Sequence, residues 1–445
     1  MDGTGMNTDI PTVFPGGNVF AVRKRSLFGF FLFSFLTLPV VIPAAIFTGV
    51  MFMYFAGWFL ARFSVPRRMV SIVVPMIVFM AVGVAGAGAN LPYDIAKDIW
   101  YCGKGVLALM VGYVLMRRIG SLGKMIECII LSAAVTSLVH IIKFLSITHT
   151  AADETIAQIR ADSGKGYFIA VVAVVIIASL KHFDIEVFKQ NRWVVKITLI
   201  LSLISLMVAL SRTLWGSLII MLLYIYGYLT MKNLKKGMIV LFLFGLLLLI
   251  AFTVPKSQQA GPQKTFLGKI AHSFKEIMIS EYKNKKDIAE NWRGFESFKA
   301  LQTYVREGGG IRYLIGGGFG KKVDIGFEMQ LGREKMRYLP TLHNGYLYAL
   351  VKTGLVGLFL YFVFFWRIIR YGRQDSSEDP HVRFAGKMIV ALSLVFLAVT
   401  VVTAGFFNKT TYMPAVVLLG SFIAYASGMS ARDATGDQLR RIHDE

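Results

Sequence analysis

Apolar stretches long enough to cross a bilayer recur along most of this 445-residue chain. A membrane-spanning helix takes about 20 apolar residues, because its backbone polar groups must be satisfied internally within hydrocarbon. The hydrophobic fraction of 55% is more than a soluble chain of this size buries with ease. We therefore predict an all-α polytopic membrane protein with about 12 transmembrane helices and one large, partly helical loop on its outer side.

The predicted spans divide the chain into five parts. Residues 1–26 precede the first span, 27–254 hold the first nine spans, 255–345 form the loop domain, 346–428 hold the last three spans, and 429–445 form a tail. By residue number the spans are 27–43, 45–62, 69–89, 104–116, 126–147, 166–180, 195–210, 213–230, 237–254, 346–366, 385–405 and 411–428.

Basic residues in the short connections predict which side of the membrane each connection faces, because short loops rich in Lys and Arg remain cytoplasmic. With twelve spans, the basic connections and both termini fall on one side: Arg23–Arg25, Arg62–Arg68, Arg117–Arg118, Lys181–Arg192, Lys232–Lys236, Arg367–Arg373 and the tail. Topology thus explains much of the net charge of +22, and we expect no nucleic-acid partner.

The loop domain is predicted on the opposite, outer side. Residues 255–342 carry 16 Lys and Arg against 9 Asp and Glu, a surplus of 7 that favours contact with something anionic. Apolar residues recur at helical spacing in "KTFLGKIAHSFKEIMISEY" and in "NWRGFESFKALQTYV", and glycine-rich chain follows them.

Arg212 is the only charged residue between Ile197 and Thr230. This run is too long for one span, so we expect a break at Ser211–Thr213 that holds the guanidinium among helix ends. Arg212 could simply snorkel to the interface and anchor a helix end. An ionisable group at that depth also suggests a functional site.

Three more outward-facing residues share this chemical character: Arg160 in "ETIAQIRADSGKG", Arg293 in "ENWRGFESF" and His343 in "LPTLHNGYLYALVKTGLVG". Singly, an external Arg is usually a solvated charge, and a His at a helix start usually packs or caps. Together they place guanidiniums, which suit diphosphate, on the same face as an imidazole, which suits proton abstraction.

Two other signals do not support a site. "GGGFGKK" lacks the first glycine of a phosphate-binding loop, because that position is Ile315. The carboxylates Asp94, Asp98, Asp153 and Glu154 are scattered over two loops rather than clustered as metal ligands, so we expect neither a metal nor another cofactor.

The region from Val195 to Tyr371 resembles the bacterial O-antigen ligase and O-antigen polymerase superfamily. The resemblance rests on the S-R-T turn, on Arg293 followed by "YLIGGGFG", and on a pattern of the form H-N-x-x-L-x-x-L-x-x-x-G-x-x-G. That pattern is matched by His343, Asn344, Leu347, Leu350, Gly354 and Gly357.

The resemblance implies inverting, metal-independent transfer of a glycan from undecaprenyl diphosphate to an acceptor hydroxyl at the periplasmic face of the bacterial inner membrane. His343 would be the catalytic base, and Arg212, Arg293 and Arg160 would bind the diphosphate. Asn344 would orient substrate or cap a helix. Membrane lipids would surround the spans.

Several alternatives remain open from sequence alone. We favour a ligase, whose acceptor is lipid A core, over a polymerase, whose acceptor is a second lipid-linked glycan. A lipid-linked sugar transporter or flippase is a rival from another class, but the spans lack the acidic residues that commonly couple transport. A structural scaffold would need neither His343 nor Arg212 beyond folding.

Overall fold

The computed structural model describes residues 17–62, 67–150, 163–164, 167–209, 211–229, 287–288, 291–307, 309–331, 334–373, 379–407 and 410–444, with side chains described over slightly narrower ranges. Helices dominate these residues. The helices of the bundle are α1 (Gly17–Thr37), α2 (Ala44–Arg62), α3 (Arg67–Ala85), α4 (Pro92–Ile119), α5 (Leu122–Thr150), α7 (Phe168–Ser179), α8 (Arg192–Val208), α9 (Arg212–Ile225), α15 (Gly345–Arg373), α16 (Pro380–Thr400) and α17 (Met413–Asp444). Short 3-10 helices cover Leu38–Val40 (η1), Lys181–Phe183 (η2) and Thr410–Tyr412 (η4).

The predicted all-α membrane fold is confirmed. Every predicted span except 237–254, which lies outside the described residues, coincides with one of these helices. In the described part of the chain, 5 helices are long and apolar enough to cross a membrane, namely α3, α4, α5, α15 and α16, and further apolar helices are shorter. The number of spans stays a prediction.

Two small-residue contacts hold the centre of the bundle together. At Gly112 of α4 an added methyl group would overlap the carbonyl of Val417 in α17, and at Gly420 it would overlap the carbonyl of Leu109. The Ser421 hydroxyl also donates to the Gly112 carbonyl at 3.1 Å. Close backbone approach through small residues is how membrane helices gain packing energy, since lipid offers no hydrophobic drive between them.

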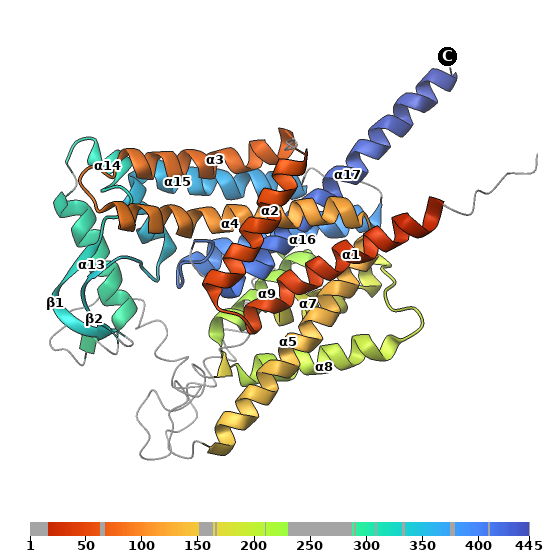
Figure 1. The fold of residues 1–445 in the computed structure, drawn as a ribbon, viewed down its shortest axis with the longest axis horizontal. Coiled ribbons are helices and arrows are strands. Elements are labelled where there is room, and N and C mark those ends of the chain that lie inside the picture. Colours follow the sequence, from red (N-terminus) through yellow and green to blue (C-terminus); the bar gives the residue numbers. More distant parts are fainter. Residues whose placement is uncertain are drawn as a thin grey trace, which may run out of the picture.

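The loop domain lies at one end of the bundle, and we call this end the loop-domain end. It contains α13 (Trp292–Glu307), α14 (Arg312–Ile315) and the strands β1 (Val323–Leu331) and β2 (Glu334–Leu339). Figure 1 shows these elements gathered at the left, while the start of α1 and the end of α17 lie at the right. Both described ends of the chain are therefore on the side away from the loop domain.

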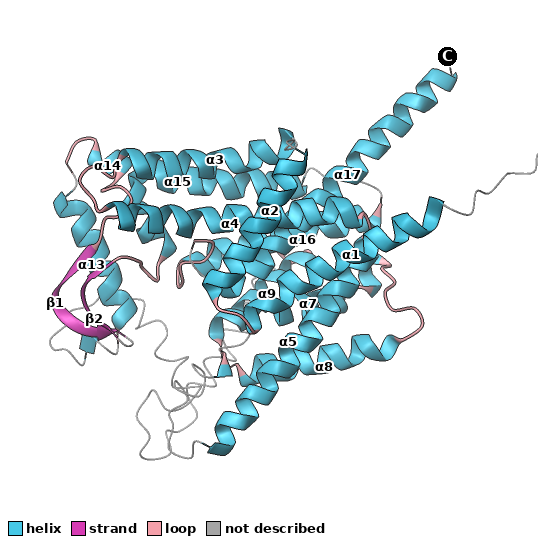
Figure 2. Ribbon diagram, viewed as in Figure 1, coloured by secondary structure: helices cyan, strands magenta, loops and turns pink. Residues whose placement is uncertain are grey.

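The structure differs from expectation in two places. The predicted span 104–116 is part of the longer α4, which already begins at Pro92 and so makes most of the expected loop 90–101 helical. The loop domain also contains an antiparallel hairpin of β1 and β2, which was not predicted and is drawn in magenta in Figure 2. Residues 264–282, predicted as a helix, lie outside the described residues.

Candidate active site

His343 is held by a buried carboxylate of α13. Its imidazole Nδ1 lies 2.8 Å from Glu296 Oε2, and its backbone N–H donates to Glu296 Oε1 at 3.1 Å. The Glu296 side chain is 3% exposed, whereas that of His343 is 43% exposed. Both carboxylate oxygens thus engage one residue, which leaves the outer edge of the imidazole facing solvent.

This contact fixes the chemical state of the ring. An ionised Glu296 carboxylate only accepts hydrogen bonds, and in that state Nδ1 of His343 carries the proton that Glu296 receives. In the neutral imidazole, Nε2 is then an unprotonated acceptor, and the carboxylate stabilises the imidazolium that forms when Nε2 gains a proton. A histidine oriented in this way can act as a general base.

Asn344 is a helix cap. Its side-chain Oδ1 accepts from the backbone N–H groups of Tyr346 at 3.0 Å and Leu347 at 3.2 Å. These groups open α15 and have no partner within the helix, so capping stabilises the helix start that follows His343. The cap accounts for Asn344 without any contact to substrate.

Arg293 lies near the start of α13, three residues before Glu296, and residues at this spacing neighbour one another on a helix. Its charge also acts on the hydroxyl of Tyr412. The Tyr412 ring packs against Phe168 at the start of α7, with ring centroids 5.4 Å apart.

Arg212 is the first residue of α9, directly after Ser211. Because α9 packs on α7 and both helices begin at the loop-domain end, Arg212 stands at the same end of the bundle as Phe168. Arg160, the remaining predicted diphosphate ligand, lies outside the described residues.

The helix starts at this end share an electrostatic property. The first turns of α9, α13 and α15, all within the described chain, contain no acidic residue. A helix N-terminus carries about half a positive charge, so a cation there is disfavoured by roughly 0.3–1 kcal/mol unless an anion compensates it. Arg212 and Arg293 lie at two of these starts.

A glycine-rich segment, residues 316–322, fastens the loop domain to the bundle. Asn90 donates to the carbonyls of Gly317 at 2.9 Å and Phe319 at 2.8 Å, and the Phe319 N–H donates to the Gly83 carbonyl at 2.7 Å. Gly318 has φ of +77°, and a side chain there would also overlap the backbone of Gly86. This close approach requires glycine, and it explains the motif that resembles a phosphate-binding loop.

A buried ion pair lies beneath this segment. Asp98 Oδ2 accepts from Lys352 Nζ at 2.6 Å and from the Gly320 N–H at 2.6 Å, and Oδ1 accepts from the Tyr348 hydroxyl at 2.8 Å. Nearby, Asp94 pairs with Lys322 at 2.6 Å. Both carboxylates thus have lysine partners, and no group of 3 or more His, Cys, Asp or Glu side chains gathers within the described residues.

These features define the class of the protein: a polytopic helical membrane protein whose loop domain holds a histidine–carboxylate pair, with arginines at the starts of α9 and α13. Residues 197–362 match the family model described as O-antigen ligase. The match supports membership of the O-antigen ligase and O-antigen polymerase superfamily, as the sequence resemblance predicted. The match supports an O-antigen ligase-like function at the level of the family and suggests activity of glycosyltransferase type. No curated protein matches the chain.

The sequence prediction did not include Glu296. The signal was present, because this acid shares the buried face of an amphipathic helix with Trp292 and Ala300, at spacings of four residues. A charged residue on such a face requires a partner. Its partner, His343, lies 47 residues further along the chain, and only the fold reveals the pairing.

Proposed function

We propose that the protein transfers a glycan from undecaprenyl diphosphate to an acceptor hydroxyl at the periplasmic face of the inner membrane. The single observation that carries the proposal is the His343–Glu296 pair, in which a buried carboxylate holds an exposed imidazole with Nε2 available as a base. The match of residues 197–362 to the O-antigen ligase family model and the arginines at the starts of α9 and α13 support the choice of donor.

In the proposed reaction, the acceptor hydroxyl attacks the anomeric carbon that bears the diphosphate. His343 Nε2 takes the hydroxyl proton, a contribution worth about two to four orders of magnitude in rate. A new carbon–oxygen bond forms as the bond to the diphosphate breaks, and the departing oxygen takes the bonding electrons. Attack opposite the leaving group inverts the anomeric carbon.

Arg212 and Arg293 would stabilise the charge that grows on undecaprenyl diphosphate. Each prearranged donor at such a site contributes about 3–4 kcal/mol to the transition state. The two guanidiniums would supply positive charge where other glycosyl transfers use a metal, which makes a metal-independent step chemically reasonable. Arg160 is proposed as a further ligand of the diphosphate on the sequence alone.

We favour ligation to lipid A core, because the cationic loop domain suits an anionic acceptor. The test uses purified protein with an undecaprenyl-diphosphate-linked repeat unit, with and without lipid A core. Product that requires lipid A core supports a ligase. A ladder of longer glycans from the donor alone would instead make the protein a polymerase and contradict the proposed acceptor.

The matched control for the base is His381. The His381 side chain is also 43% exposed, and its Nδ1 lies 3.8 Å from Oδ1 of Asp379. Unlike His343, it lies at the start of α16, away from the loop domain. We expect His343→Ala to abolish transfer and His381→Ala to leave it unchanged. Equal activity of the two variants would remove His343 from the chemistry.

A further inference from the structure

The loop domain carries an exposed apolar patch where the chain passes from α13 to the glycine-rich segment. Ile311, directly before α14, is 67% exposed, Leu314 within α14 is 49% exposed, and Val305 near the end of α13 is 58% exposed. We call these three residues the α14 patch. Two exposed arginines, Arg306 and Arg312, lie next to them in the sequence. Exposed apolar residues that gather on one surface indicate a site of interaction.

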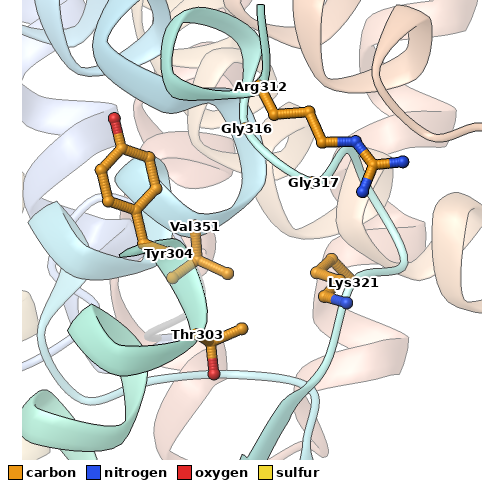
Figure 3. Close-up of a pocket in the computed structure, with 7 residues that line it drawn as sticks. All are labelled: Thr303, Tyr304, Arg312, Gly316, Gly317, Lys321 and Val351. Atoms are coloured by element: carbon orange, nitrogen blue, oxygen red, sulfur yellow. The ribbon is translucent and has the colours of Figure 1, made fainter. Parts of the chain in front are cut away.

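The α14 patch is held in shape by two tyrosines. The Tyr304 hydroxyl donates to the Tyr313 carbonyl at 2.7 Å, and the Tyr313 hydroxyl donates to the Val305 carbonyl at 3.3 Å. Figure 3 shows the Arg312 side chain extending from α14 away from Tyr304. An ordered part of the chain therefore presents both the apolar groups and the charge.

The length of α3 places the α14 patch at the outer boundary of the bilayer. This helix begins at the basic pair Arg67–Arg68, which we predict on the cytoplasmic side, and its 19 residues rise about 28 Å. The hydrocarbon of a bilayer is about 30 Å thick. Just after α3, an added methyl group at Gly86 would lie 3.2 Å from the carbonyl oxygen of Ile315, the last residue of α14. The α14 turn therefore lies where the hydrocarbon of the outer leaflet ends.

The α14 patch also continues the lipid-facing surface of the bundle. Exposed apolar residues recur at spacings of three or four along α15, as in a stripe that faces lipid: Leu355, Phe359, Phe362 and Trp366. The stripe ends toward the loop domain at Leu355. At the neighbouring Gly354, an added methyl group would overlap the carbonyl of Leu314. Val84, in the last turn of α3, is 46% exposed and lies two residues before Gly86. The patch thus adjoins the outer ends of two helices that face lipid.

We propose that the α14 patch docks on the outer leaflet of the membrane, while Arg306 and Arg312 contact the phosphates of anionic lipids. A surface that combines apolar side chains with basic ones binds at the boundary between acyl chains and headgroups. The acyl chains accept the apolar groups, and the anionic headgroups attract the charge.

This contact bears on the candidate active site through α13. The helix carries Val305 of the patch and also Glu296, the carboxylate that holds His343. Docking of its end on lipid therefore helps to set the level of the imidazole relative to the bilayer. The contact with lipid itself is independent of the transfer reaction.

The first experiment measures the depth of the α14 patch with a fluorescent label. Leu314→Cys is labelled with bimane in the full-length protein, with Cys128 replaced by alanine and the buried Cys102 retained. The protein is reconstituted in vesicles of phosphatidylcholine and phosphatidylglycerol with brominated acyl chains, which quench a label that contacts lipid. We expect about half the quenching found at Phe359→Cys, a position on the lipid-facing stripe of α15, because the patch lies at the boundary rather than deep in the bilayer.

The matched control is Tyr338→Cys, because Tyr338 is similarly exposed, at 52%, but lies on the hairpin that packs on α13. Iodide in the aqueous phase should quench this label, and brominated lipid should not. Ile311→Cys repeats the measurement if the Leu314 variant does not fold. Quenching of the patch labels by iodide alone would overturn the proposal. Protection from both quenchers would also overturn it, because another protein surface, such as a second copy, would then cover the patch.

The second experiment tests the two arginines. When only one of the two lipids is brominated, the label at Leu314 reports which lipid lies next to it. We expect phosphatidylglycerol to quench about fivefold more per mole than phosphatidylcholine, as for the attraction of one arginine to an anionic surface. Joint replacement of Arg306 and Arg312 by glutamine should remove this difference. Arg373→Gln, which removes an exposed charge at the opposite end of α15, should preserve it. Equal quenching by the two lipids in the wild type, or equal loss in the Arg373 variant, would overturn the contact with anionic lipid.

Discussion

Replacing Glu296 by glutamine isolates the role of the carboxylate behind His343, because the change conserves shape and removes one acceptor oxygen. Two N–H groups of His343, on the backbone and at Nδ1, need acceptors at this position. Glutamine supplies only one. In one orientation the amide nitrogen of the glutamine faces the backbone N–H of His343, and two donors oppose each other. In the other orientation the amide nitrogen donates to Nδ1, which forces the ring proton onto Nε2.

Both orientations of the glutamine amide should weaken His343 as a base, although residue 296 itself does not contact substrate. Removing an orienting partner from a histidine typically costs 10–100-fold in activity, and imposing the wrong tautomer in a catalytic triad costs about 10⁴ in kcat. We therefore expect kcat for glycan transfer to fall by about 10–10⁴, equivalent to about 1–5 kcal/mol at 1.36 kcal/mol per tenfold. KM should change little, because the Glu296 side chain is only 3% exposed and does not face substrate.

The assay follows transfer from the lipid-linked donor as a gel shift of the glycan product, with kcat and KM measured separately. Glu328→Gln is the matched control, since it makes the same charge change at an exposed position of β1. Thermal unfolding checks that both variants are folded. An unchanged kcat in folded Glu296→Gln protein, or a loss confined to KM, would refute the assignment of His343 as a base held by this carboxylate.

Three further predictions test the diphosphate site, the buried ion pair and the hairpin. Arg212→Ala should lower kcat by about 10²–10³ and Arg212→Lys by less, and equal kcat in Ala and wild type would exclude a role in charge stabilisation. Asp98→Asn should destabilise the protein by about 3–5 kcal/mol in thermal unfolding, because the charge of Lys352 is left buried and uncompensated. The double variant Asp98→Leu with Lys352→Met should cost less, because it leaves no unpaired charge. The Arg337 guanidinium holds the pKa of Asp324 at about 2, so this pair should protect hairpin amides from hydrogen exchange above about pH 4 and lose that contribution as pH falls toward 2. The effect should be small because the pair is exposed, and Asp324→Asn should abolish the pH dependence.

The helices of the bundle could be predicted from sequence because each depends on local apolar content and length. The predicted spans 27–43 and 45–62 correspond to separate helices, with α1 ending at Thr37 and α2 beginning at Ala44. The helix predicted from "NWRGFESFKALQTYV" is α13. These features need no knowledge of distant partners.

The hairpin was missed although its signal is local. Residues 323–331 alternate apolar and polar or small side chains in "VDIGFEMQL", the period of a strand with one buried face. The glycine-rich chain that precedes these residues is typical of a loop. The Lys352–Asp98 pair could not be predicted for a different reason. Asp98 precedes Lys352 by 254 residues and was predicted to lie in a loop.

The long-range contacts explain how a histidine outside the spans can be held firmly at the membrane surface. His343 precedes α15, and α15 is tied to α4 by the Lys352–Asp98 pair two to three turns into the helix. The glycine-rich segment adds contacts to α3 and α4. The hydrogen bond from Glu296 limits rotation of the His343 imidazole ring. The lipid tail of the proposed donor sets the depth of its diphosphate in the bilayer. A base that must deprotonate a hydroxyl attacking the carbon next to that diphosphate therefore has to be fixed relative to the spans. The buried ion pair, the glycine-rich segment and the carboxylate together supply that fixation.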